Sequence, residues 1–312
     1  MPELITSPSN PKIKRLLALQ QKSSARREAG LFVVEGRREL QHCLDAGFSV
    51  DTVFVCGSLF GRGGHGFAGV AAEKTPSPEA ATAPGNLATL GIVRGRGPSS
   101  DGRGPAEQDV SGGSWPLPEN IRVFEVSEEV YAKISYREGT EGIIAEVRTP
   151  ERRLEDLVLP EKPLVVVLES VEKPGNLGAV LRSADAAGAD AVLVCDPLTD
   201  LWNPNLIRAS VGAVFTVPCV ACSSEAAIAF LQARGIRILT AQLQDSSLYY
   251  DCDMTGGTAI VMGTEATGLT PVWREAADAH IRIPMLGRLD SLNVSVSAAI
   301  LLFEAVRQRQ NG

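Results

Sequence analysis

The chain has 312 residues, of which 44% are hydrophobic, and this is enough for two ordinary domains that each bury a core. Its formal net charge of −7 excludes a protein that binds nucleic acid over its whole surface, so any such site must be a local basic patch. We find no signal peptide and no apolar run near the roughly 18 residues that a membrane helix needs. The sequence therefore predicts a cytoplasmic protein without a membrane partner.

Six cysteines are scattered along the chain, and only Cys219 and Cys222 are spaced as a CxxC pair. No second CxxC and no pair of histidines completes a zinc site, so we expect ordinary buried thiols and no bound metal. Free cysteines of this kind are typical of a reducing compartment.

Residues 1–148 predict a small α/β domain. A helix should begin after Asn10, and Gly47 should end a second helix. Runs of β-branched and other large apolar residues indicate the strands. The expected strands are 31–34, 50–55, 121–126 and 142–147, and the expected helices are 12–21, 38–46 and 128–134.

The front of this domain is basic, with eight lysines and arginines against three acids in the first 38 residues. The charges belong either to a solvated helix face or to a patch that neutralises phosphates. On the second interpretation the candidate RNA-binding residues are Lys12, Lys14, Arg15, Arg26 and Arg27.

The composition changes abruptly between residues 57 and 118. This span holds 14 of the 30 glycines and seven of the 19 prolines, with few large apolar residues. Such a segment cannot bury enough surface to offset its chain entropy, so we expect a flexible insertion that interrupts the first domain.

After a charged linker at 149–163, residues 164–312 show regular alternation of strand and helix patterns. This alternation predicts a largely parallel sheet with helices on both faces, and ligands of such sheets bind beyond the carboxyl ends of the strands. The expected strands are 164–168, 191–194, 215–220, 236–240, 259–262 and 280–283, and the expected helices are 176–187, 204–211, 224–234 and 271–277.

The loop after the first of these strands carries Asn176, a natural helix N-cap, and Gly178. Arg182 follows on the helix, and its long side chain can reach back toward the loop because helical side chains lean toward the N-terminus. A surface arginine without a special role is the alternative.

Two further segments follow strand ends. In 263–269, two glycines bracket Glu265, which suits backbone contact with a ligand, although turns at strand ends are commonly glycine-rich. In 283–304, a strand end passes through a turn at Gly287 into a helix with a buried apolar face. Taken alone, this last segment could be only a capped C-terminal helix.

Together the three segments resemble a known family. NLGAVLRSADAAGAD, IVMGTEATGL and IPMLGRLDSLNVSVSAAILLFE are similar, in this order, to the three motifs of the SpoU/TrmH family of SPOUT RNA methyltransferases. The similarity covers about residues 164–309. ITSPSNPKIKRLLAL and REAGLFVVEGRREL are similar to the small RNA-binding domain that precedes the catalytic domain in many members, whereas the insertion at 57–118 departs from the pattern.

The resemblance implies methylation of a ribose 2′-hydroxyl in RNA with S-adenosylmethionine as cofactor. It also implies a deep trefoil knot in the C-terminal domain, and a homodimer whose active site uses both subunits. By motif, the cofactor-binding residues are expected to be Gly263, Gly268, Ile283, Pro284, Met285 and Leu292. The residues expected at the methyl acceptor and its supports are Asn176, Arg182, Glu265, Ser291 and Asn293.

The chemistry is compatible with these residues. A methyl group on a sulfonium is already activated, so alignment of the hydroxyl is the main task and no metal is required. Arg182 is the family's proposed helper in removing the hydroxyl proton. Because a guanidinium is hard to deprotonate, we favour a role in clamping phosphate and stabilising the developing alkoxide.

Several alternatives remain open at this point. The substrate is expected to be rRNA, but the same chemistry on tRNA fits the motifs equally. A non-catalytic RNA-binding or assembly factor on the same fold would be expected to carry a broken motif, and the five acceptor-side residues are all present. The third alternative is an α/β enzyme for another adenosine-containing ligand.

Overall fold

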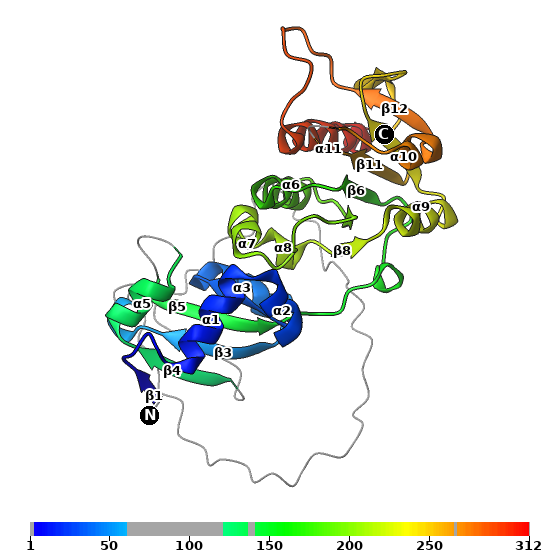
Figure 1. Cartoon of the computed structure of the whole chain (residues 1–312). Helices are drawn as coiled ribbons and strands as arrows, with labels where there is room; N and C mark the ends of the chain where they lie inside the picture. The colour runs from blue at the N-terminus through cyan, green and yellow to red at the C-terminus, as the bar shows by residue number, and fades with distance from the viewer. Residues whose placement is uncertain (1–2, 61–120, 137–140, 265–266, 312) are drawn as a thin grey trace, which may run out of the picture. The chain divides into compact units, whose positions relative to one another are not determined.

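The computed structural model describes residues 3–60, 121–136, 141–264 and 267–311. The chain divides into two compact units (Figure 1), one comprising residues 1–40 and 48–148 and the other residues 41–47 and 149–312. The insertion expected at about 57–118 lies outside the described residues except for its first four, which form the short helix α4 (Gly57–Phe60). Phe60 is buried, so this short piece belongs to the core of the first unit.

The first unit contains a five-stranded sheet with the order β1-β4-β3-β5-β2. β5 runs antiparallel to both of its neighbours, and the other pairs are parallel. The strands are β1 (Glu3–Ile5), β2 (Leu31–Glu35), β3 (Val50–Val55), β4 (Arg122–Val126) and β5 (Ile143–Arg148). The helices, besides α4, are α1 (Pro11–Gln21), α2 (Ser23–Ala29) and α5 (Glu128–Ile134). Helix α3 (Arg37–Asp45) is divided between the two units at residue 40.

The start of helix α1 and its buried face both follow from its sequence. The backbone N–H of Lys12 donates to the Asn10 side chain at 2.9 Å, which confirms the predicted start of this helix. Ile13 and Leu16 recur at helical spacing and are fully buried in one cluster with Phe54 of β3. This apolar stripe fixes α1 on the sheet.

The second unit contains a seven-stranded sheet with the order β10-β12-β9-β11-β6-β7-β8, and every pair in it is parallel. This confirms the predicted α/β class. The strands are β6 (Leu164–Glu169), β7 (Ala191–Cys195), β8 (Cys219–Cys222), β9 (Arg237–Ala241), β10 (Ser247–Leu248), β11 (Thr258–Met262) and β12 (Ala279–Arg282). The helices are α6 (Pro174–Ala186), α7 (Pro204–Ser210), α8 (Ala213–Thr216), α9 (Ser224–Ala233), α10 (Pro271–Ala276) and α11 (Val294–Asn311), with 3-10 turns at Leu154–Asp156 and Tyr249–Asp251.

Helices cover both faces of this sheet because successive side chains of each buried strand point to opposite faces. Val165, Val167 and Val261 pack with α9 and with the fully buried Trp273 of α10. On the other face α11 packs against α6 and β11, and Figure 1 shows α6 and α11 side by side. The loops that follow the strands lie at the carboxyl ends of the strands.

One predicted strand is wrong. The run expected at 215–220 is divided into the short helix α8 and strand β8, with Pro218 between them. Gly212 adopts a left-handed φ of 88° before α8, and the backbone N–H of Val214 donates to the Ser210 hydroxyl at 3.4 Å. These local bonds begin a helical turn where residue preferences alone favour a strand.

None of the described helices is long and apolar enough to cross a membrane. The trefoil knot expected from the resemblance stays a prediction.

Candidate active site

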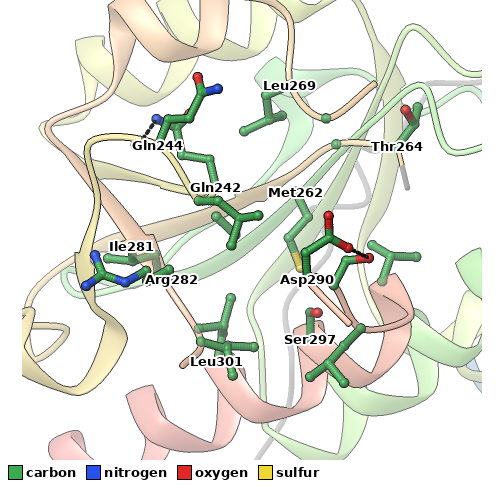
Figure 2. A pocket seen from close by; sticks show the side chains of 18 of the residues that line it. Gln242, Gln244, Met262, Thr264, Leu269, Ile281, Arg282, Asp290, Ser297 and Leu301 are labelled. Atoms are coloured by element: carbon green, nitrogen blue, oxygen red, sulfur yellow. Dashed lines mark hydrogen bonds between the residues drawn. The ribbon is translucent and has the colours of Figure 1, made fainter. Parts of the chain in front are cut away.

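A pocket of about 460 Å³ lies at the carboxyl ends of β9, β11 and β12, where the α/β rule expects a ligand. Figure 2 shows side chains from these segments around one space, with Ser297 and Leu301 coming from α11. The volume is within the range typical of small-molecule sites. The loops after β9, β11 and β12 contribute residues, and the last two contain the segments 263–269 and 283–304 that were singled out in the sequence.

The loop after β11 folds back on itself at its two glycines. A Cβ on Gly263 would lie 2.4 Å from the carbonyl carbon and oxygen of Gly268, so no larger residue fits without moving backbone. Gly268 adopts a left-handed φ of 69°, and its N–H donates to the carbonyl of Thr264 at 3.0 Å. Both glycines line the pocket. Glu265, between them, lies outside the described residues.

The segment between β12 and α11 forms a second wall. Ile283, Met285, Ser291 and Leu292 all line the pocket, whereas Pro284 is not among the lining residues. The Ser291 hydroxyl is 3.4 Å from the Asp290 carboxylate. The second and third motifs, which α10 and β12 separate in the chain, therefore meet around one cavity.

Asn176 and Asn293 are also brought together, although neither lines the pocket. The Asn293 side-chain N–H donates to Asn176 Oδ1 at 3.2 Å. Asn293 Oδ1 accepts from the backbone N–H of Ser295 at 3.0 Å and from the Ser295 hydroxyl at 2.6 Å. One side chain thus caps the start of α11 and links it to α6.

The predicted role of Asn176 as an N-cap is wrong. Helix α6 begins at Pro174 with Lys173 as its N-cap, because proline suits the first helical turn, where no N–H partner is lost. Asn176 therefore lies inside the first turn. Arg182 is exposed farther along α6, is not among the pocket-lining residues, and makes no ion pair with another described residue.

The lining residues suit an adenosine-containing ligand. Apolar side chains such as Leu269, Ile281 and Leu301 offer surface to a flat ring, and the two glycines expose backbone groups. Gln242 adds a polar feature that sequence reasoning missed: its side-chain N–H donates to the Gln244 carbonyl at 2.9 Å, and its Oε1 is buried without a partner among the described residues. An N–H donor on a ligand would satisfy this acceptor. The only signal in the sequence was its place just after a predicted strand.

The cysteines do not take part in this pocket. All six are free, and burial raises the pKa of the Cys219 thiol to about 12, so the thiol stays neutral. Among the described residues, no group of three or more His, Cys, Asp or Glu side chains could hold a metal ion.

The five candidate RNA-binding residues of the first unit differ in their exposure and their partners. Arg26 is buried and donates to the carbonyls of Leu19 at 2.6 Å and Gln20 at 3.3 Å, so its predicted place on an RNA-binding surface is wrong. Arg15 is paired with the buried Glu146, and Lys12 with Glu3 at 2.7 Å. Lys14 and Arg27 are exposed, with no ion pair to another described residue.

Comparisons with known proteins agree with this geometry. A model of the SpoU rRNA methylase family matches residues 163–303, and a model of the MRM3-like substrate binding domain matches residues 10–75. The 23S rRNA (guanosine-2′-O-)-methyltransferase RlmB of Pseudomonas putida is 39% identical over 178 residues, which cover 54% of this chain and 71% of that protein. The 23S rRNA (guanosine(2553)-2′-O)-methyltransferase RlmP of Bacillus subtilis is 32% identical over 187 residues, covering 60% of this chain and 73% of that protein.

Two solved structures are similar over nearly the whole chain. An RNA 2′-O ribose methyltransferase has a TM-score of 0.71 and 34% sequence identity, covering 98% of this chain and 99% of that one. An AdoMet-bound rRNA methyltransferase from Sinorhizobium meliloti has a TM-score of 0.73 and 27% identity, covering 98% of this chain and 97% of that one.

Proposed function

The chain belongs to the SpoU rRNA methylase family, and we propose on this premise how its residues methylate a ribose 2′-hydroxyl of rRNA with S-adenosylmethionine. The family predicted from the three motifs is thereby confirmed, and so is the cofactor class. The observation that carries the proposal is the 460 Å³ pocket at the sheet's carboxyl ends, which is lined by residues of the second and third motifs.

In this proposal the pocket holds the cofactor. The backbone groups of Gly263, Ile283 and Leu292 bind it, while Gly268 and Met285 shape the surrounding wall. Pro284 lies in the chain between the lining residues Ile283 and Met285. When bound, S-adenosylmethionine supplies a methyl group that the sulfonium has already activated, so the protein's task is to position the acceptor. The apolar walls exclude water from that position.

The acceptor side is formed by residues next to the pocket. Asn176 and Asn293, joined by their 3.2 Å hydrogen bond, set the spacing between the starts of α6 and α11. Ser291 and Glu265 complete the polar surroundings of the hydroxyl. Arg182 clamps a phosphate of the RNA and stabilises the negative charge that develops on the ribose oxygen.

The first unit contributes RNA binding. A match to a substrate-binding domain over residues 10–75 and the exposed charges of Lys14 and Arg27 support this role. Lys12 and Arg15 keep part of their charge exposed beside their acidic partners. Such residues supply affinity without sequence specificity.

We further propose a cytoplasmic homodimer. Helix α11 and the segment before it expose large apolar side chains, among them Leu286 at 96% and Phe303 at 48% exposure. Exposed apolar groups on neighbouring segments favour a protein partner. A second copy of the chain would cover them and bring its own residues to the site.

The proposal is tested by mapping ribose 2′-O-methylation across total RNA from cells with and without the gene. One lost site in rRNA is the expected result. Loss of a tRNA site instead would support the tRNA alternative, and an unchanged methylation map together with defective ribosome assembly would support a non-catalytic factor. Methyl transfer by the purified chain to rRNA in vitro would identify the enzyme directly.

A further inference from the structure

Glu169 is a carboxylate at a position where the strand is otherwise apolar. It ends β6 after five buried aliphatic residues and is itself only 2% exposed. Burial of a carboxylate costs folding free energy unless hydrogen-bond donors satisfy its oxygens, so Glu169 needs such donors nearby.

The donors come from Thr270. Its backbone N–H lies 2.9 Å from Glu169 Oε2, and its hydroxyl lies 2.5 Å from Glu169 Oε1. Both oxygens of the carboxylate are therefore used to hold one residue. Thr270 is the residue directly after the loop 263–269, whose glycines line the pocket.

A second set of hydrogen bonds lies next to Glu169 and is centred on the Ser224 hydroxyl. The Trp273 side-chain N–H donates to the Ser224 hydroxyl at 2.9 Å, and this hydroxyl donates to Asp196 at 2.6 Å. The same hydroxyl is 3.5 Å from Glu169. The polar cluster thereby brings together the end of β6, the residue after β7 and the starts of α9 and α10.

The other side of Glu169 leads to the first motif. Ser170 follows it in the left-handed region with a φ of 52°, and its N–H donates to the Cys195 carbonyl at 2.9 Å. From this turn the chain continues to Asn176. Glu169 thus lies at the base of two loops, one on the acceptor side and one on the cofactor side.

We propose that Glu169 is a positioning residue for cofactor binding. Its carboxylate holds Thr270, and through it the C-terminal limb of the loop 263–269, so that the backbone of Gly268 and Leu269 faces the pocket. This inference rests on the proposed function of the pocket. It adds that the end of the loop, residues 267–269, is held in place by a carboxylate that does not itself touch the cofactor.

Three variants test the proposal by calorimetric titration of S-adenosylmethionine and by steady-state kinetics. Glu169→Gln replaces one acceptor by a donor facing Thr270 and should weaken cofactor affinity about tenfold, the effect of losing one buried charged hydrogen bond. Thr270→Val removes only the hydroxyl and should weaken affinity about threefold, whereas Thr270→Ser should bind as the parent does. The KM for the cofactor should rise in the weakened variants, while kcat at saturation stays within about twofold.

Asp190→Asn is the matched control. Asp190 accepts from the backbone N–H of Leu164 at 2.8 Å, at the opposite end of the same strand β6. This variant should lower the melting temperature while leaving cofactor affinity unchanged. If Glu169→Gln fails to fold, the difference in cofactor affinity between Thr270→Val and Thr270→Ser tests the proposal instead.

Parent-like affinity in both Glu169→Gln and Thr270→Val would overturn the inference, and so would an equal loss of affinity in Asp190→Asn. Either result leaves the proposed function intact as long as the parent binds the cofactor. A parent chain that bound no S-adenosylmethionine would overturn the proposed function, and this inference with it.

Discussion

Arg182 is exposed on α6 and makes no ion pair with another described residue, so its guanidinium is available to RNA. If it stabilises charge that develops on the ribose oxygen, Arg182→Ala should lower kcat by about 100-fold, as loss of one such donor does elsewhere. Cofactor affinity should stay within about twofold, because Arg182 is not among the residues that line the pocket. Titration and single-turnover methyl transfer measure the two quantities separately.

Arg234→Ala provides the control for this variant. Arg234 is also exposed in the second unit, but it lies after α9, where it contacts the Phe230 ring at 3.8 Å. Its removal should leave methyl transfer unchanged. Near-normal turnover of Arg182→Ala would exclude Arg182 from the mechanism.

Asn293 has two roles that substitutions can separate. Asn293→Asp keeps the oxygen that caps α11 but loses the N–H that donates to Asn176. It should therefore retain the parent's melting temperature and lose turnover. Asn293→Ala removes the cap as well and should also cost about 1 kcal/mol of folding stability. Thermal unfolding and methyl transfer measured on both variants check this, and equal turnover in the parent and Asn293→Asp would show that the link to Asn176 has no role in catalysis.

At the residue scale, the sequence predicted which residues lie in one site more accurately than it predicted their local conformation and contacts. Gly263 and Gly268 were singled out for backbone contact with a ligand, and both line the pocket. Their close approach to each other was not predicted. Asn176 was expected to cap a helix, but Pro174 begins the helix one turn earlier. Gln242 could not be found from the sequence, because only the folded chain shows that its Oε1 lacks a partner.

At the scale of elements, helices α1 and α2 carry the five candidate RNA-binding residues, and Lys14 and Arg27 are the two that are exposed without an ion pair to another described residue. The double variant Lys14→Glu, Arg27→Glu should weaken RNA binding and reduce the steepness of its salt dependence by about one unit per lost phosphate contact. Filter binding at several salt concentrations measures both effects. Arg26 is left unchanged because its buried bonds to Leu19 and Gln20 support the α1–α2 corner.

Lys133→Glu serves as the control charge reversal in the same unit. Lys133 lies on α5, where it pairs with Glu129 at 3.3 Å and has 54% of its side chain exposed. RNA affinity that fell equally in Lys133→Glu and in the double variant would indicate a general charge effect. Unchanged affinity in the double variant would mean that Lys14 and Arg27 are only a solvated surface.

Element types followed from the sequence wherever one local signal dominated. The buried strands β6, β7 and β11 are continuous aliphatic runs, and such runs suit a parallel sheet that is covered on both faces. Helix α2 was missed because SSARREA has no apolar periodicity, and its stability comes from packing and from the left-handed Gly30 at its end. Strand β10 has only two residues, too few for any pattern.

At the scale of the whole molecule, the strand order could not be derived from local patterns. β12 lies between β9 and β10, although β11 separates it from β9 in the chain. Such an order depends on long-range packing, including α11 against α6, and a window of sequence does not contain that information. The alternation of strand and helix patterns predicted the parallel α/β class, and the resemblance of the motifs added the family.

The proposed homodimer predicts that a charge on the exposed apolar stripe of α11 prevents two copies from associating. Phe303 is half exposed on α11, seven residues after the similarly exposed Val296, so the two lie on one outward stripe. Phe303→Glu places a charge on this stripe, which would be costly to bury between two copies, and should shift the protein to monomers. Because Phe303 is not part of the chain's own core, the melting temperature of the monomer should change little. Methyl transfer should be lost if each site requires both subunits.

Val158→Glu is the control, since Val158 is 58% exposed in the segment before β6 and does not belong to the stripe on α11. Size-exclusion chromatography with light scattering gives the mass of both variants, and cofactor titration tests whether the pocket of a monomer still forms. A Phe303→Glu protein that stayed dimeric would place the interface on another surface. A monomer with full activity would instead show that one chain supplies the whole site, so that the exposed stripe on α11 serves some purpose other than completing it.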